Sequence, residues 1–258
     1  MTVPLSEFLP ANLFAVFLVF ARLGAVMMLL PGFGELYVPQ RYRLLLGLLL
    51  ALLLAPLLGP RLPALPGSPA RLAVLVGGEV AIGIFIGTVA RILVAALETA
   101  GMVVSLQLGL SAAVIFNPLG EQDQSPLPSA FYGMLGVVLI FLTDLHYLLL
   151  RAMVDSYALF VPGALPPMGD LADTIARVAA GSFKLGIEMA APFIVLGLVF
   201  FVALGIIARM VPQLQVLFIS QPLQILGGLL VFAVVVATGM RWFLEGFVQQ
   251  FAFLAPGG

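Results

Sequence analysis

The sequence lacks cysteine and contains a single histidine, His146, among its 258 residues. Without thiols the chain cannot form disulfides, thiolate zinc sites or iron–sulfur clusters, and a cysteine nucleophile is excluded. One imidazole cannot build a multi-histidine metal site or a bis-histidine haem site. We therefore expect no metal-binding and no cofactor-binding residues.

Charge is also scarce, since charged residues make up 9% of the chain and the net charge is −1. This balance gives no electrostatic case for binding nucleic acid. The sequence has no nucleophile elbow, Walker loop or dinucleotide fingerprint. We therefore expect no catalytic residues, no cofactor and no enzymatic activity.

Apolar residues are present in excess, at 62% of the chain, and the mean hydropathy is +1.20. A soluble domain has about 45–50% apolar and about 25% charged residues. Folding in water would leave too little polar surface to cover the apolar side chains. The composition predicts an all-α, polytopic membrane protein, and we expect one membrane-embedded domain over residues 1–258.

Runs of apolar residues mark the expected helices, since a spanning helix needs roughly 20 of them. The expected segments are 13–30, 44–58, 72–116, 130–150 with a helical extension to 157, a long helix up to 210 with a kink at Pro192, and 223–243. Proline-rich or polar connectors are expected at 59–69, 117–129, 162–173 and 212–222.

The third segment is too long for one membrane crossing. Between Pro69 and Pro118 there is no proline, and about 45 residues of straight helix would measure roughly 68 Å. The hydrocarbon core of a bilayer is only about 30 Å thick. The segment must therefore turn back, with a turn expected from Glu98 to Gly101, or lie largely outside lipid in a protein assembly.

Several ionisable residues interrupt the apolar segments, and each is expensive to place in lipid. They are Arg22, Glu79, Arg91, Glu98 and Glu188. One interpretation is a proton or ion relay, and the other is polar contact with partner subunits or a position outside the bilayer. Because the acids are scattered along the chain, the second interpretation is favoured.

Small residues follow Glu79 at helical spacing. Gly83 and Gly87 lie four residues apart, on one face, and would let another backbone approach closely. This pattern fits packing within the chain as well as it fits a subunit interface. Further along, Gly109 would weaken the helix just before the polar stretch 117–129. A polar stretch is usually an exposed surface loop, but one between two apolar segments can also reach into a pore and block it.

Ordered signatures along the chain resemble one family. The signatures are Arg22 with Val38-Pro-Gln-Arg41-Tyr-Arg43, Glu79-x-x-x-Gly83-x-x-x-Gly87, Thr99-Ala-Gly101, Gln107-Leu-Gly109-Leu-Ser111, Asn117-Pro118, Asp144-Leu-His146, Val154-Asp155-Ser156-Tyr157, Ala191-Pro192 and Arg209-Met-Val-Pro212-Gln213. In order and spacing they resemble the FliR family of flagellar biosynthesis proteins, which is paralogous to the export-gate T subunits of virulence type III secretion systems. Where the family usually has Asn-Gly before the histidine, this chain has Asp144-Leu145.

The resemblance implies a subunit of the flagellar type III protein export gate, located in the bacterial inner membrane at the flagellar basal body. Such a subunit assembles with FliP and FliQ into the pore for unfolded flagellar proteins, with FlhB around the complex and FlhA beneath it. The implied fold is a set of long broken helices and helical hairpins in a helical assembly, much of it raised out of the bilayer.

The resemblance also implies roles for individual residues. The pore plug would comprise about 111–128, with Ser111, Phe116, Asn117, Pro118, Gly120, Glu121, Gln122, Asp123 and Gln124 as its residues. The resemblance implies gate or packing roles for Glu79, Gly83, Gly87, Gly101, Gln107 and Gly109. Subunit contacts fall on Arg22, Arg91, Arg209, Pro212 and Gln213.

Two other functions stay open at the level of sequence. The first is the T subunit of a virulence secretion system, which these residues barely distinguish from the flagellar protein. The second is a secondary transporter or ion channel, in which Glu79, Glu98 and Glu188 would relay ions, although no inverted repeat of the transporter type is evident.

Overall fold

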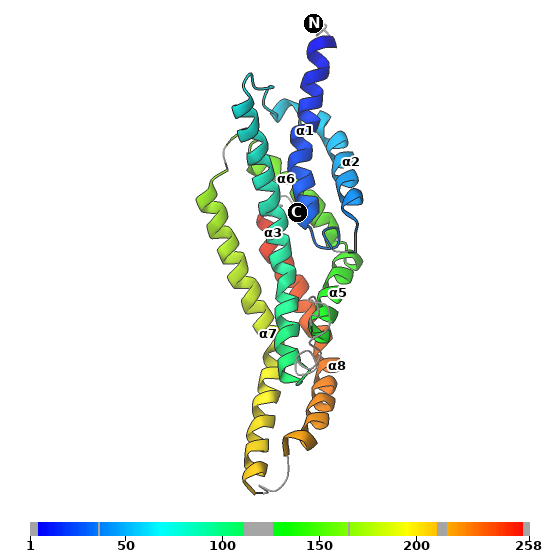
Figure 1. Cartoon of the computed structure of the whole chain (residues 1–258), viewed down its shortest axis with the longest axis vertical. Helices are drawn as coiled ribbons and strands as arrows, with labels where there is room; N and C mark the ends of the chain where they lie inside the picture. The colour runs from blue at the N-terminus through cyan, green and yellow to red at the C-terminus, as the bar shows by residue number, and fades with distance from the viewer. Residues whose placement is uncertain (1–4, 36, 111–125, 165, 211–215, 255–258) are drawn as a thin grey trace. The chain divides into compact units, whose positions relative to one another are not determined.

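The computed structural model describes residues 5–35, 37–110, 126–164, 166–210 and 216–254, and the regular structure among them is entirely helical (Figure 1). The elements are α1 (Leu5–Leu29), α2 (Gln40–Leu58), η1 (Gly59–Arg61), α3 (Pro69–Gln107), α5 (Leu127–Leu142), α6 (Leu145–Leu159), α7 (Met168–Met210), α8 (Val216–Phe251) and η2 (Ala252–Leu254). The prediction of an all-α fold is confirmed.

Five of these helices are long and apolar enough to cross a membrane, and the number rises to six if the pair α5 and α6 counts as one broken span. Their mean hydropathies range from 2.1 to 2.7. The predicted polytopic membrane character is therefore confirmed by helix length and composition.

Helix α3 runs unbroken from Pro69 to Gln107, over 39 residues. The expected turn from Glu98 to Gly101 is therefore wrong, and the helix measures about 58 Å at 1.5 Å per residue. Glycine signals a turn only where the backbone needs a left-handed conformation. In α3, Gly101 is instead a helical residue that makes room for a neighbouring helix.

The segment expected to run from 130 to 157 is two helices, which is a second correction. Helix α5 ends at Leu142 and α6 begins at Leu145. Between them Asp144 has a positive φ of 61°, a left-handed conformation that aspartate tolerates better than most residues. The break therefore falls where the family usually has Asn-Gly, a pair well suited to that conformation.

Two prolines lie inside the last two long helices, and the sequence predicts only one of them there. Helix α7 continues through Pro192 up to Met210, as expected. Helix α8 begins at Val216 and contains Pro222, so the expectation of a connector over 212–222 is wrong for its second half. Proline lacks only one backbone donor and is tolerated in apolar helices whose surroundings satisfy the freed carbonyl group.

The chain divides into two compact units. The first comprises Met1–Ile92, Phe141–Val178 and Gln250–Gly258, and in it α1 packs against α2 while α6 lies against η2. The second comprises Leu93–Ile140 and Ala179–Gln249. Its interior includes the ring of Phe232, which lies 5.3 Å from that of Tyr132 and 6.1 Å from that of Phe193, between centroids. The single domain expected over residues 1–258 stays a prediction.

Candidate functional site

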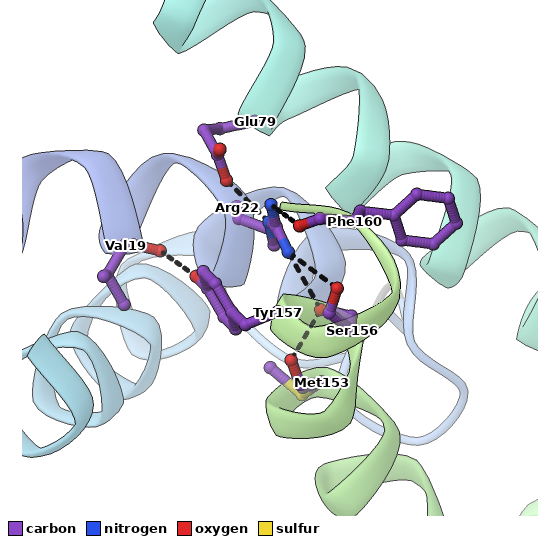
Figure 2. A network of polar contacts seen from close by, with 7 residues as sticks. All are labelled: Val19, Arg22, Glu79, Met153, Ser156, Tyr157 and Phe160. Atoms are coloured by element: carbon purple, nitrogen blue, oxygen red, sulfur yellow. Dashed lines mark hydrogen bonds and ion pairs between the residues drawn. The ribbon is translucent and has the colours of Figure 1, made fainter. Parts of the chain in front are cut away.

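The first unit contains a buried ion pair. Arg22 of α1 is fully buried, and Glu79 of α3 is 2% exposed. The Arg22 Nε–H donates to Glu79 Oε2 across 2.6 Å (Figure 2). Two charges removed from water in this way are tolerable only when they are paired and hydrogen-bonded.

The rest of the Arg22 guanidinium lies against the end of α6. Its Nη1 donates to the carbonyl oxygen of Ser156 at 3.1 Å and to Ser156 Oγ at 3.2 Å, and its Nη2 donates to the carbonyl oxygen of Phe160 at 3.1 Å (Figure 2). The last carbonyl groups of a helix have no partner within the helix and carry partial negative charge. A cation at this position therefore caps α6.

An aromatic ring completes the cluster. The Arg22 guanidinium carbon lies 4.0 Å from the centre of the Tyr157 ring, which is close enough for a cation–π interaction. The Tyr157 hydroxyl donates to the carbonyl oxygen of Val19 at 3.5 Å. The cluster joins α1, α3 and α6 through a single side chain, and every nitrogen of that side chain has a partner within the chain.

Gly83 and Gly87 place α3 directly on α1, close to the ion pair. A Cβ atom at Gly83 would lie 2.8 Å from the Cβ of Ala25, and one at Gly87 would lie 2.6 Å from the Cβ of Leu29. Real Cβ atoms do not approach so closely, so no larger residue fits without moving α1. The two glycines therefore pack against α1 within the chain, and a role at a subunit interface stays a prediction.

Gly101 has the same role in the second unit, where it faces α5. A Cβ atom on Gly101 would lie 2.7 Å from the carbonyl oxygen of Pro128. Next to this contact, the Ser129 hydroxyl donates to the carbonyl oxygen of Glu98 at 3.0 Å. The start of α5 is thereby fixed on α3.

The end of α3, just before the predicted plug, is a closed helix terminus. Gly109 has a φ of +72°. Its N–H donates to the carbonyl oxygen of Leu106 at 3.2 Å, and the N–H of Leu110 donates to that of Ser105 at 3.1 Å. These bonds form a Schellman motif, in which a left-handed glycine satisfies the last carbonyl groups. Gly109 therefore ends the helix rather than only weakening it.

Two other helices hold this terminus. The side-chain Nε2 of Gln224 in α8 donates to the carbonyl oxygen of Gln107 at 2.6 Å. Gly197 of α7 lies against the side chain of Gln107, and Gly228 of α8 lies against that of Leu108. We call this arrangement around residues 105–110 the loop root.

Comparison with known proteins fits this helical, apolar structure. The family model of bacterial export proteins, family 1, matches residues 13–250. The chain belongs to this family. The match covers both units and nearly all the described helices.

Individual relatives within the bacterial export family agree. The chain is 40% identical to the flagellar biosynthetic protein FliR of Caulobacter vibrioides over 212 residues, which cover 82% of this chain and 84% of the relative. It is 30% identical to FliR of Bacillus subtilis over 218 residues, 83% of each chain. It is also 28% identical to the Yop proteins translocation protein T of Yersinia pestis over 156 residues, 59% of each chain. The resemblance to the FliR family and to its T-subunit paralogues is confirmed.

The structure places the other predicted residues of this family member as follows. Arg91 Nη1 lies 4.0 Å from Glu35 Oε1 and is half exposed. Arg209 is exposed in the last turn of α7. Arg22 contacts its own chain, and its role at a subunit contact stays a prediction. The predicted plug residues and two predicted contact residues lie outside the described part of the chain. They are Ser111, Phe116, Asn117, Pro118, Gly120, Glu121, Gln122, Asp123 and Gln124 of the plug, and Pro212 and Gln213.

Sequence reasoning did not assign a site role to several residues that the structure brings together. Ser156 and Tyr157 stood in a family signature, and that was the only sequence signal that pointed to them. Gln224, Gly197 and Gly228 hold the loop root, yet they lie in long apolar helices where neither glycine nor glutamine stands out. Only the tertiary contact between α3 and these two helices identifies them.

Proposed function

We propose that this chain is a subunit of the flagellar protein export gate in the bacterial inner membrane. It assembles with FliP and FliQ into the pore for unfolded flagellar proteins, with FlhB and FlhA as further partners, and it is not an enzyme. The observation that carries the proposal is the 40% identity to the Caulobacter vibrioides FliR across 82% of the chain.

The length of helices α7 and α8 supports assembly with other proteins. Helix α7 has 43 residues and α8 has 36, so they measure about 64 and 54 Å, against about 30 Å of hydrocarbon. Exposed apolar side chains extend along both helices, with Leu198 at 66% and Ile206 at 59% in α7 and Leu230 at 64% in α8. Lipid cannot cover apolar surface of this length, and helices of partner subunits can.

The loop root supports a plug role for the segment that follows it. Both ends of the segment are held in the second unit, at Gly109 by the Schellman motif and at Ser129 by its bond to Glu98. A segment with fixed ends and a polar sequence can occupy a pore mouth and still move between its anchors. We propose that this segment seals the resting pore.

A pull-down tests the assembly. The tagged chain is solubilised in mild detergent from its own membranes, and co-purifying proteins are identified by mass spectrometry. We expect FliP and FliQ homologues in stable amounts. Recovery of the tagged chain alone would contradict the proposal.

Deleting residues 117–124 tests the plug. We expect the complex to assemble and the membrane to leak ions, because the described contacts of the loop root and of Ser129 are made by residues outside 117–124. Leakage is measured as dye uptake or loss of membrane potential, with assembly followed on native gels. A matched control replaces the same eight residues with a Gly-Ser linker of equal length, which separates loop length from loop chemistry. A tight membrane in the deletion strain would refute the plug role.

The second candidate is the T subunit of a virulence secretion system, favoured by the 28% identity to the Yop translocation protein T. Gene deletion separates the two candidates. Loss of motility indicates the flagellar system, whereas loss of effector secretion indicates the virulence system.

An ion relay has less support. Glu79 is held by Arg22 at 2.6 Å, and Glu188 lies 3.7 Å from Lys184, so two of the three relay acids already have cationic partners.

A further inference from the structure

The Schellman motif at the end of α3 leaves the carbonyl group of Gln107 to be satisfied from elsewhere. The two bonds of the motif use the carbonyl oxygens of Ser105 and Leu106, and the next carbonyl group along the helix takes no part in it. Gln224 of α8 supplies the missing donor, since its Nε2 donates to the Gln107 carbonyl oxygen at 2.6 Å. The last carbonyl groups of a helix carry partial negative charge, so an N–H group is the favoured partner here.

Packing holds the Gln224 side chain in this position. A Cβ atom at Gly109 would lie 3.7 Å from the amide carbon of Gln224, so the amide group lies over the glycine that ends the helix. One turn further along α8, Gly228 lies against the side chain of Leu108. The last turn of α3 is therefore attached to α8 by one amide hydrogen bond and one close contact at a glycine.

The direction of the chain beyond α3 depends on this attachment. Helix carbonyl groups point toward the C-terminus, so a bond to the carbonyl group of Gln107 orients the peptide from which the chain leaves the helix. The hydroxyl group of Ser105, on the same turn, is buried and has no hydrogen-bond partner in the described part of the chain. Gln224, and not Ser105, therefore provides the side-chain hydrogen bond at this turn.

We propose that Gln224 is a positioning residue for the plug. Its bond to the Gln107 carbonyl oxygen sets the direction in which the segment after residue 110 leaves α3 in the resting pore, and the bond stays closed while that segment moves. The inference rests on the proposed plug role, and it gives α8 a part in sealing the pore.

Substitution of Gln224 tests the role of the hydrogen bond. Gln224→Met keeps the length of the side chain and removes the donor, whereas Gln224→Glu places a carboxylate against the Gln107 carbonyl oxygen. The matched controls are Gln221→Met and Gln221→Glu, since Gln221 is exposed one turn earlier in α8.

Each variant is expressed in a strain that lacks the wild-type gene, and dye uptake is measured in resting cells. We expect uptake to rise several-fold in both Gln224 variants and to stay at the wild-type level in both Gln221 variants, with equal amounts of assembled complex on native gels. Wild-type uptake in both Gln224 variants would overturn the inference.

An introduced disulfide tests whether Gln224 acts through position. A Cβ atom at Gly228 would lie 3.9 Å from the Cβ of Leu108, close to the mean of about 3.8 Å in disulfides, and the chain has no cysteine of its own. Leu108→Cys/Gly228→Cys is therefore combined with Gln224→Met. A second pair, Gln107→Cys/Gly197→Cys, has a Cβ separation of 3.7 Å and replaces the first if the first does not assemble.

We expect the combined variant to leak when the thiols are reduced and to return to wild-type dye uptake when they are oxidised, because the disulfide restores the attachment. Each single cysteine with Gln224→Met is the control and should leak under both conditions. Disulfide closure is followed as loss of free thiols. A leak that persists after closure would mean that Gln224 does not act through the position of this turn.

Two further measurements complete the test. Because the bond stays closed during opening, the oxidised Leu108→Cys/Gly228→Cys variant with native Gln224 should export flagellar protein at the wild-type level, and arrest of export on oxidation would contradict this. The deletion of residues 117–124 separates this inference from the plug role. A leak in the deletion strain with tight Gln224 variants overturns the inference alone, whereas a tight deletion strain refutes the plug role and the inference with it.

Discussion

At the scale of single residues, Arg22 and Glu79 form a buried ion pair with side chains that are 0% and 2% exposed. Removing two charges from water costs several kcal/mol per ion, and their attraction offsets that cost only when the geometry is good and the other polar groups are satisfied. Here the Nε–Oε2 distance is 2.6 Å, and Ser156 and Phe160 accept the remaining guanidinium bonds. We therefore expect the pair to specify which helices meet more than it adds net stability.

Replacing Glu79 with leucine tests this view. The variant Glu79→Leu leaves the Arg22 cation buried without its anion, so we expect the free energy of unfolding to fall by about 3–5 kcal/mol. The measurement is the apparent Tm of the purified complex in detergent. The double variant Arg22→Met/Glu79→Leu should lose less than the single one, because no unpaired charge remains.

The matched control is Glu245→Leu, which removes an exposed carboxylate from α8. We expect a change within about 0.5 kcal/mol, as is usual for surface positions. If Glu79→Leu were as mild as this control, or if the double variant were less stable than the single one, the buried pair would not have the role assigned to it.

The sequence identified both members of this pair but not their contact. Charged residues inside apolar segments stand out in any sequence, because lipid and protein interiors both penalise them. Arg22 and Glu79 are separated by 57 positions, however, and no local spacing predicts which buried cation meets which buried anion. Every residue has a backbone carbonyl group, so the sequence cannot predict that those of Ser156 and Phe160 accept hydrogen bonds from Arg22.

At the scale of elements, glycine has two separate functions in and just after α3. Gly83, Gly87 and Gly101 are helical residues that let another helix approach, whereas Gly109 takes a left-handed conformation and ends the helix. Sequence alone does not separate these functions, which is why it predicts a turn at Gly101. In the structure Gly101 continues α3 and contacts the start of α5.

The variant Gly87→Leu tests the packing of α3 on α1. A leucine there meets Leu29 and the carbonyl oxygen of Val26, so we expect overpacking to cost about 1–3 kcal/mol, seen as a lower apparent Tm and less assembled complex on native gels. The control Gly77→Leu lies in the same helix, where a Cβ atom would have no neighbouring atom within 4 Å. It should be neutral or stabilising, since leucine favours helix more than glycine does by about 1 kcal/mol. Equal behaviour of the two variants would contradict the packing assignment.

The sequence predicts a helix boundary where several prolines cluster. It does not predict a boundary that depends on the backbone conformation of a single residue. The connector after α2 follows from its four prolines, Pro60, Pro63, Pro66 and Pro69. The break before α6 depends on the left-handed backbone of Asp144, and an apolar pattern continues across it. Pro222 lies inside α8 and not in the expected connector, because an apolar helix with tertiary support tolerates one missing donor.

At the scale of the whole molecule, the helices that carry the 62% apolar composition differ widely in length. Helix α2 has 19 residues and matches a bilayer, whereas α3, α7 and α8 have 39, 43 and 36 and exceed it. Composition predicted a membrane protein correctly but could not assign apolar surface to lipid or to protein. The lengths of α3, α7 and α8 exceed one bilayer crossing, which supports the proposed subunit of a larger assembly.

Export of flagellar subunits tests the central claim most directly. In a strain from which this gene is deleted, the amount of flagellar protein in the culture medium is measured with and without the chain supplied from a plasmid, and the same protein inside the cells is measured as the control for synthesis. We predict that export stops in the deletion strain while synthesis continues, and that the wild-type chain restores it. Undiminished export without the chain would contradict its role in the export gate.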